Sequence, residues 1–477
     1  MHIIICNHFI YLLSVVDVTQ SSSAAVIFEG GTDTIGGNAV VLKVEKKATA
    51  FQYLFDFGVS MDAYRPQRTL RSEPESIEEF VRRGLISDFD MNFRACFLSH
   101  AHPDHCVALP SLCRSKHRPA ALWATKTTSR LVDNVQFIEK PLHIDTFEKG
   151  DYYEDLVAND HGLNVKVALY PVDHDVPGAC SFFVIAENAL LIYTGDFRDH
   201  GFLSEVIKSQ FWEYAKLLQS KNRFHSCTVV CEGTNFGLPF DFRSQRDFDD
   251  RMKDILKHYA KDLVSLIINS DGLWDLFSTI RIAETQKVGR QIVLSRTLSK
   301  FLDKIRNSFL EDYRRAVTKE GLAAFQAMMN LNRFMIYDPR RGDSIDLLRK
   351  ISANPSKYLL FLTRNDAFHA LEEIAMFSGQ VGGCCVLSFS ANESTYEPAT
   401  RTFAEAIGHI GFCVEKTNVL ARGHVSPHRL VDIMASIKPS KVFVMHTLAP
   451  EGLKAFLQSH LDCEIIAPSK GARYDIC

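Results

Sequence analysis

The stretch FLSHAHPDHCVALP, residues 97–110, places three histidines and an aspartate within six positions, directly after an apolar run. In an extended segment, residues i and i+2 point to the same side, so His100 and His102 can reach one metal ion. The chain then turns at a proline, and Asp104 and His105 point to a neighbouring position. Imidazole nitrogens mixed with a carboxylate oxygen are the donor set that Zn²⁺ takes. The stretch therefore predicts metal binding where a strand meets a loop.

Further metal donors follow other apolar runs, as a site for two ions requires. His174 lies beside a turn in YPVDHDVPGACSFFV, Asp196 follows the run ALLIYTG, and His446 ends KVFVMH. Together with the first cluster they supply seven ligands, which suits two metal ions that share a bridging carboxylate. Asp56, in YLFDFG, is another acid at a strand end. We expect it to orient a ligand histidine or the loop without binding metal itself.

The overall composition is that of a globular protein. A chain of 477 residues exceeds one ordinary core, so two domains are expected. Hydrophobic residues make up 46% and charged residues 23%, and the net charge of -3 gives no global basic footprint for nucleic acid. The 12 cysteines are scattered without a CxxC pair, and Cys384 and Cys385 are adjacent. This usage favours reduced thiols over a disulfide framework or a zinc ribbon.

The apolar N-terminus, MHIIICNHFIYLLSVVDV, raises the question of targeting. It has no Lys or Arg before the apolar run, Asn7 and His8 interrupt it, and it is shorter than the roughly 20 residues of a spanning helix. We interpret residues 1–23 as a leader or an extra strand. The sequence predicts no membrane segment and a cytoplasmic protein.

Short apolar runs alternate with helical patterns along the chain, which indicates an α/β sandwich. The pattern over residues 24–236 predicts a meander of strands that continues into alternating strands and helices. Residues 237–383 predict a second α/β unit that is mostly helical, and residues 384–477 resume the first style of sheet. The second unit is therefore expected to be inserted into the first.

Several of these motifs resemble a known family. SHAHPDH, TGDF and a late histidine at a strand end resemble the metallo-β-lactamase fold. Three features resemble the β-CASP branch of that fold, which processes nucleic acids. They are the inserted unit, VVCEGTNF and ARGHVSPHRLVDIMASIKPSKVFVMHT. GGTDTIGGNAVVLK and QIVLSRTLSK resemble ribonuclease J within the branch. The resemblance implies an αββα sandwich with an inserted α/β β-CASP-like domain, from Ala24 to the end of the chain.

The resemblance also implies a division of the ligands between two ions. One ion would be held by His100, His102 and His174, the other by Asp104, His105 and His446, and Asp196 would bridge them.

Other residues acquire roles by the same resemblance. His424 would face the scissile phosphate as an electrophilic donor, and Glu232 would buttress the site from the branch's first acidic motif. Arg296 stands at a predicted strand-to-helix turn, which is well placed for an anion. Ser426 is a further candidate for binding phosphate.

These features predict a zinc-dependent phosphodiester hydrolase that cleaves RNA, exo- or endonucleolytically, with two zinc ions activating a water. Mn²⁺ and Fe²⁺ are alternatives, because the same nitrogen and oxygen ligands accept them. The expected partner is single-stranded nucleic acid, RNA in preference to DNA, and a homo-oligomer is left open.

Three other functions are weighed against this one. A DNA nuclease of the same branch differs only in a contact to the 2′-hydroxyl, which the sequence does not reveal. A small-molecule hydrolase of a thioester or lactone would not need the inserted unit. A metal-free binding module would be expected to lack some of the ligands, and all seven are present.

Overall fold

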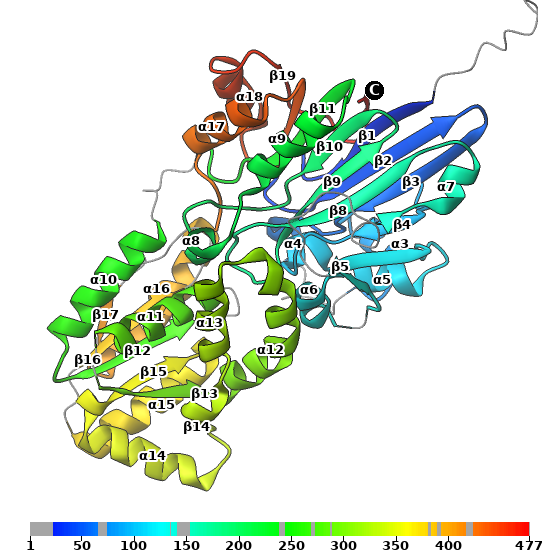
Figure 1. The fold of residues 1–477 in the computed structure, drawn as a ribbon. Helices are drawn as coiled ribbons and strands as arrows, with labels where there is room; N and C mark the ends of the chain where they lie inside the picture. The colour runs from blue at the N-terminus through cyan, green and yellow to red at the C-terminus, as the bar shows by residue number, and fades with distance from the viewer. Residues whose placement is uncertain are drawn as a thin grey trace, which may run out of the picture.

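The computed structural model describes residues 22–64, 74–133, 135–140, 153–237, 244–268, 272–286, 289–379, 383–388, 393–415 and 423–476. These residues build three β-sheets, two of which pack face to face while the third stands apart (Figure 1). The expected leader or extra strand over residues 1–23 lies almost entirely outside the described residues. Only its last residue, Ser23, is part of a strand.

The first sheet has seven strands and gathers most of the first meander. Its β1, β2 and β3 pair antiparallel in sequence order, while β3, β4 and β5 are parallel neighbours. In sheet order the strands are β20 (Arg473–Asp475), β1 (Ser23–Gly30), β2 (Ala39–Lys46), β3 (Thr49–Phe55), β4 (Ala95–Phe97), β5 (Ala121–Thr125) and β6 (Ile138–Lys140).

The second sheet also has seven strands, and it joins the middle of the chain to its C-terminal part. Its β10, β11 and β18 are parallel neighbours, so their carboxyl ends lie at the same edge of the sheet. In sheet order the strands are β19 (Glu464–Ile466), β18 (Lys441–Met445), β11 (Ser226–Glu232), β10 (Ala189–Tyr193), β9 (Cys180–Ala186), β8 (Val165–Pro171) and β7 (Tyr153–Glu154).

One hydrophobic core lies between the two sheets, and a further core lies on the outer face of each. Alternate side chains of the strands, such as Phe28, Phe55 and Phe182, fill the space between the sheets. Short helices, α3 (Ile77–Arg82) and α5 (Leu109–Arg114), cover the first sheet. The second sheet is covered by α9 (Phe211–Lys221), α17 (Pro427–Ile437) and α18 (Pro450–Gln458). The predicted αββα sandwich is confirmed.

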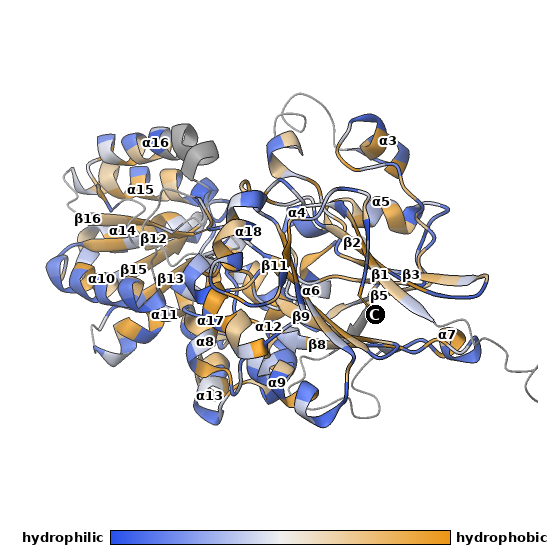
Figure 2. Ribbon diagram, turned by 90° about the horizontal axis from the view of Figure 1, so that it is seen from above, coloured by the Kyte–Doolittle hydropathy of each residue, from blue (hydrophilic) through white to orange (hydrophobic). Residues whose placement is uncertain are grey.

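The third sheet belongs to the inserted unit, and its strands are all parallel. Their order is β14 (Met335–Tyr337), β13 (Gln291–Ser295), β15 (Tyr358–Leu362), β12 (Leu263–Ile268), β16 (Gly383–Ser388) and β17 (Cys413–Glu415). The helices of the unit are α10 (Gln245–His258), α11 (Leu273–Thr285), α12 (Arg296–Ala316), α13 (Lys319–Met328), α14 (Gly342–Ala353), α15 (Arg364–Ser378) and α16 (Glu393–His409). In Figure 2 the strands are mostly hydrophobic and α10 is largely hydrophilic.

The pairing of two late strands corrects the expected boundary at residue 383. We expected residues 384–477 to resume the sheets of the sandwich. Instead, β16 pairs along its whole length with β12, and β17 pairs with β16, so the third sheet extends to Glu415. The apolar run of β16 resembles the buried strands of either unit, because both kinds of sheet are covered on both faces. The amino-acid composition of this run could not by itself assign β16 to the sandwich or to the inserted unit.

The inserted unit packs against the sandwich beside α6 (Lys126–Leu131) and α8 (Phe202–Val206) (Figure 1). Asp312 of α12 accepts hydrogen bonds from the backbone N–H groups of Lys126 and Thr127, the first residues of α6. No helix within the described ranges combines the length and the apolar character needed to cross a bilayer.

Candidate metal centre

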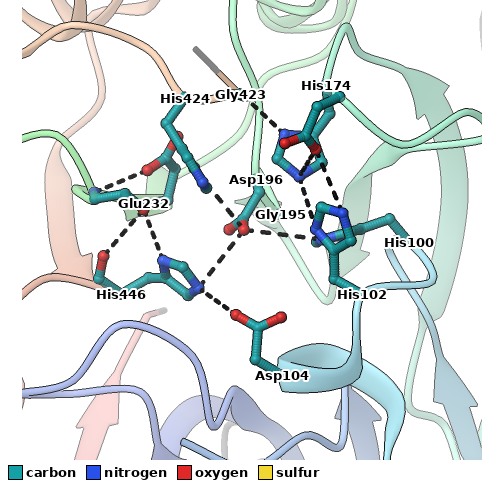
Figure 3. Close-up of polar contacts among 12 residues, drawn as sticks. His100, His102, Asp104, His174, Gly195, Asp196, Glu232, Gly423, His424 and His446 are labelled. Atoms are coloured by element: carbon teal, nitrogen blue, oxygen red, sulfur yellow. Dashed lines mark hydrogen bonds and ion pairs between the residues drawn. The ribbon is translucent and has the colours of Figure 1, made fainter. Parts of the chain in front are cut away.

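The side chains of the site project from strand ends at one edge of the sandwich (Figure 3). His174 follows β8, Asp196 follows β10 and His446 follows β18. Because β10 and β18 both run parallel to β11, the last two emerge at the same edge. The first cluster follows β4, and Asp104 and His105 lie on the one-turn helix α4 (Pro103–Cys106). All seven predicted ligands converge there.

The first group of donors is formed by His100, His102, His174 and Asp196. His102 Nδ1 lies 3.1 Å from His100 Nε2 and 3.1 Å from His174 Nε2. Zn²⁺ bonds of about 2.0–2.1 Å in a tetrahedron separate neighbouring ligand atoms by about 3.3 Å. The three nitrogens are therefore spaced as the ligands of one ion.

The second group is formed by Asp104, His105, Asp196 and His446. His446 Nε2 lies 3.3 Å from Asp104 Oδ2, and His105 Nε2 lies 3.1 Å from Asp196 Oδ2. Asp196 Oδ2 is also 3.8 Å from His100 Nε2 of the first group, so one carboxylate faces both groups. Its other oxygen, Oδ1, is buried and has no hydrogen-bond partner among the described residues.

In four of the histidines, the ring nitrogen that faces away from the cluster donates a hydrogen bond. His100 Nδ1 donates to Ser99 Oγ at 2.9 Å, and His105 Nδ1 donates to Asp56 Oδ2 at 2.8 Å. His174 Nδ1 donates to the carbonyl of Gly423 at 2.8 Å, and His446 Nδ1 donates to Thr234 Oγ1 at 2.7 Å. These bonds place a proton on Nδ1, which in His100, His174 and His446 leaves Nε2 to bind a metal ion. His105 Nε2 lies 3.1 Å from Asp196 Oδ2 and would first have to lose the second ring proton that this contact favours. The donor set fits two metal ions.

Asp56 has the role that its strand-end position predicts. Its carboxylate is completely buried and accepts four hydrogen bonds, from His105 Nδ1, the Ser99 N–H and hydroxyl groups, and Tyr193 OH. Its φ of 58° lies in the left-handed region, which Asp tolerates better than most residues. Asp56 therefore fixes the ring of His105 without belonging to either donor group.

The electrostatics of the first group keep its imidazoles neutral. Burial lowers the pKa of His174 to about 4 and that of His100 well below its usual range. For His105, burial opposes protonation, but the carboxylates of Asp196 and Asp56 outweigh it and raise the pKa. Burial likewise opposes ionisation of Asp196, but the surrounding imidazoles, His105 foremost, hold its pKa well below the usual range. In the first group the imidazoles are therefore neutral beside an ionised carboxylate, as a cation requires, whereas His105 would have to release a proton when an ion binds.

His424 and Glu232 form a pair beside the two groups. His424 Nδ1 lies 3.2 Å from Glu232 Oε1 and 3.9 Å from Asp196 Oδ2. Burial opposes protonation of His424, but Glu232 outweighs it and raises the pKa to about 9. Glu232 Oε2 also accepts the N–H of Thr234, so the carboxylate reaches the partner of His446 as well. Both residues adjoin the donor groups, and the roles that the resemblance implies for them stay predictions.

Two residues predicted to bind phosphate are not part of the cluster. Arg296 is exposed at the start of α12, and within the described residues no polar contact joins it to the metal donors. Ser426 is the N-cap of α17, and its Oγ accepts the N–H of Arg429 at 3.2 Å. The phosphate contacts of both residues stay predictions.

Several residues of the site were missed by sequence reasoning. Ser99 and Thr234 accept from ligand histidines, and their signal was their place inside SHAHPDH and EGTNF. Trp274 of the inserted unit donates from Nε1 to the carbonyl of His174 at 2.6 Å, which no sequence pattern indicated. Asp175 Oδ1 lies 3.0 Å from His174 Nε2. It was overlooked because an acid before Val-Pro-Gly suits a turn equally well.

The GGTDTIGGN loop also gains a role. Gly36 has φ 82°, and a Cβ there would lie 2.5 Å from Asp104 Cβ. The N–H groups of Gly37 and Asn38 donate to the Asp104 carbonyl, at 3.1 and 3.2 Å. The carbonyl of Gly31 accepts the N–H of His446 at 2.7 Å. The loop therefore joins the two segments that supply the second group of donors.

The fold and site together define an α/β sandwich protein with an inserted α/β unit and two adjoining His/Asp groups that can hold metal ions. No protein-family model matches the chain, and no curated protein does. Among solved structures it is similar to a protein of unknown function from Enterococcus faecalis V583, with 21% identity and a TM-score of 0.64, covering 95% of this chain and 100% of that chain. That likeness shows a shared fold.

A second solved structure, the metallo-beta-lactamase fold protein YhfI from Bacillus subtilis, is much more distant. Its identity is 8% and its TM-score 0.36, with 95% of this chain and 99% of that chain covered.

Proposed function

We propose that this protein is a metal-dependent phosphodiester hydrolase that cleaves single-stranded nucleic acid, RNA in preference to DNA. The observation that carries the proposal is the shared carboxylate: Asp196 Oδ2 faces imidazole nitrogens of both donor groups, 3.1 Å from His105 Nε2 and 3.8 Å from His100 Nε2. A carboxylate shared in this way is the arrangement of two-ion hydrolytic centres, which suit in-line displacement at phosphorus.

When bound, two divalent ions would supply a water activated at neutral pH and would withdraw charge from the phosphoryl oxygens. The chain's own residues prepare that chemistry. The four Nδ1 bonds hold the imidazoles in one tautomer, and Asp196 stays ionised between them. We propose zinc as the metal, because imidazole and carboxylate donors suit it.

The solvent-exposed side of the cluster indicates where a substrate would approach. The side chains of His102, His424 and Asp104 are 22%, 20% and 15% exposed, whereas the remaining five candidate ligands are almost completely buried. His424 therefore lies at the open side, held at Nδ1 by Glu232 and with Nε2 left as a donor. A protonated imidazole there would stabilise charge that develops on a non-bridging phosphate oxygen.

The inserted unit supports a polymeric substrate. It adjoins the site directly, since Trp274 of α11 contacts the carbonyl of His174. A small thioester or lactone would need only the donor groups at the strand ends. A strand of nucleic acid is long enough to extend from the donor groups over the inserted unit.

The test is an assay on end-labelled single-stranded RNA and DNA, with and without a chelator. We expect cleavage of RNA that chelation abolishes and added divalent ion restores. His102→Ala should lose bound metal and activity together, whereas His460→Ala, which removes an exposed histidine that contacts Phe456 and Ser459, should keep both. Metal binding without cleavage of either polymer, combined with turnover of a thioester, would reject the nuclease proposal.

The role of His424 has its own test. His424→Ala should keep both metal ions, because the residue belongs to neither donor group, and should lower turnover by about 10²–10³-fold. Loss of metal in this variant would show that the role is misassigned. His460→Ala again serves as the matched control.

A further inference from the structure

Asp175 is a buried acid that points at the first donor group without belonging to the seven predicted ligands. It follows His174 in the loop between β8 and β9, and only 6% of the residue is exposed. Its Oδ1 lies 3.0 Å from His174 Nε2 and 3.4 Å from His102 Nε2. Neither contact has hydrogen-bond geometry, and Oδ1 has no hydrogen-bond partner among the described residues.

The tautomer of His174 makes this contact unusual. The Gly423 carbonyl can only accept, so the 2.8 Å bond from His174 Nδ1 places the ring proton on that nitrogen. In the neutral ring, Nε2 then presents a lone pair to a carboxylate oxygen 3.0 Å away. Two acceptors this close in a buried site repel each other unless a cation lies between them.

Asp175 Oδ1 is spaced from His174 Nε2 like two ligand atoms of one ion, while its contact with His102 is to Nε2, the ring nitrogen other than the Nδ1 that faces the first group. The 3.0 Å between Asp175 Oδ1 and His174 Nε2 is close to the 3.1 Å that separates His102 Nδ1 from its two imidazole neighbours. Asp196 Oδ1 is likewise a buried carboxylate oxygen that has no hydrogen-bond donor among the described residues. Both of these oxygens belong to acids that lie beside the candidate ligand histidines.

Gly423 leaves room for this carboxylate. A Cβ at Gly423 would lie 2.6 Å from Asp175 Oδ2, so a larger residue would push the carboxylate away. The same glycine supplies the carbonyl that fixes His174. One backbone segment thus sets both the histidine tautomer and the position of the neighbouring acid.

We propose that Asp175 is an eighth metal ligand, which gives the ion held by His100, His102 and His174 a carboxylate oxygen of its own. The inference rests on the proposed two-ion centre. In the ion-free structure Asp175 lies outside the group that Asp196 completes with the three histidines, so its carboxylate would move towards the ion on binding. With both acids the ion would have three nitrogen and two oxygen donors from the protein, more than a catalytic zinc usually takes. At this one position the set therefore favours Mn²⁺ or Fe²⁺, which accept higher coordination, over the zinc proposed for the centre as a whole.

The experiment compares wild type, Asp175→Asn and a control, Asp275→Asn. Asp275 is also a buried acid, but it accepts from Ser388 Oγ and Gln245 Nε2 in the inserted unit. Metal content is measured by mass spectrometry, and the absorption of Co²⁺-substituted protein reports the coordination number, because four-coordinate Co²⁺ absorbs more strongly than five- or six-coordinate Co²⁺. Far-UV circular dichroism checks that each variant is folded.

We expect Asp175→Asn to bind one of its two ions at least about 10-fold more weakly and to show a stronger Co²⁺ band, while Asp275→Asn matches wild type. Unchanged affinity and an unchanged Co²⁺ spectrum in Asp175→Asn would overturn the proposal while leaving the metal centre intact. A wild type that binds no metal would instead overturn the proposed function. If Asp175→Asn does not fold, the wild-type spectrum decides: two intense tetrahedral Co²⁺ bands would refute the extra ligand.

Discussion

Replacing Asp56 with asparagine tests whether a residue outside the ligand set controls the second metal ion. Asn has the same shape and tolerates the φ of 58° at this position, so the backbone should be kept. The Asp56 Oδ2 atom accepts from His105 Nδ1 at 2.8 Å and from Ser99 Oγ and Tyr193 OH, each at 2.7 Å. Oδ1 accepts only the Ser99 N–H, also at 2.7 Å.

These contacts decide how the asparagine would sit and what it would cost. Its amide oxygen keeps most hydrogen bonds at the Oδ2 position, which turns the NH₂ group towards the Ser99 N–H. A buried donor left without an acceptor costs about 1–3 kcal/mol. The bond from His105 Nδ1 survives but loses its charge assistance. Losses of this kind weaken metal binding by about 10–100-fold, or about 1.4–2.7 kcal/mol.

The assay is competition for metal with a chromophoric chelator, which resolves two binding constants. Asp56→Asn should weaken the ion bound by His105 and leave the other unchanged. Tyr193→Phe is the matched control, because it removes one donor to Asp56 but keeps the carboxylate and its bond to His105. If folded Asp56→Asn protein binds both ions as tightly as wild type, the argument that Asp56 orients His105 is refuted.

Two further substitutions probe the loops that position the ligands. Gly36→Ala should weaken binding of the second ion and destabilise the fold, because the new Cβ would lie 2.5 Å from Asp104 Cβ. Gly84 has a similar φ of 68° but nothing within 4 Å of a new Cβ, so Gly84→Ala should be destabilised only by backbone strain of about 1–2 kcal/mol. Equal metal affinities in the two variants, measured with the chelator, would contradict this. Trp274→Phe keeps the apolar packing but leaves the His174 carbonyl unpaired, at a cost of about 1–3 kcal/mol, and should weaken the first ion. Unchanged chelator competition in that variant would show that the inserted unit does not support the site.

The convergence of the seven candidate ligands could be predicted because each has a local signature. His100, His102, Asp104 and His105 form a dense cluster, and the three distant ligands each follow a buried apolar strand. Parallel strands bring their carboxyl ends to one edge of a sheet, so strand-end polar residues far apart in the chain become neighbours. The same logic predicted Asp56, whose strand end lies beside that of β4.

Other features depend on pairing partners that a single sequence does not specify. The run of β16 is as apolar as the strands of the sandwich, and only its pairing with β12 assigns it to the inserted unit. Arg296 stands at a strand-to-helix turn as predicted, but the orientation of the third sheet leaves it exposed and without a polar contact to the described metal donors. Local pattern thus predicted its element and not its neighbours.

The contact of Trp274 with His174 has a physical consequence for the whole molecule. The sandwich supplies every metal donor, yet the loop that carries His174 is held from the inserted unit at two points: Trp274 donates to its His174 carbonyl, and Tyr313 OH accepts the N–H of Gly178 at 2.8 Å. Because Trp274 and Tyr313 also pack together in the hydrophobic core that the inserted unit shares with the sandwich, the folding of the unit and the geometry of the first donor group are linked. Binding of an ion should therefore stabilise the inserted unit as well as the sandwich.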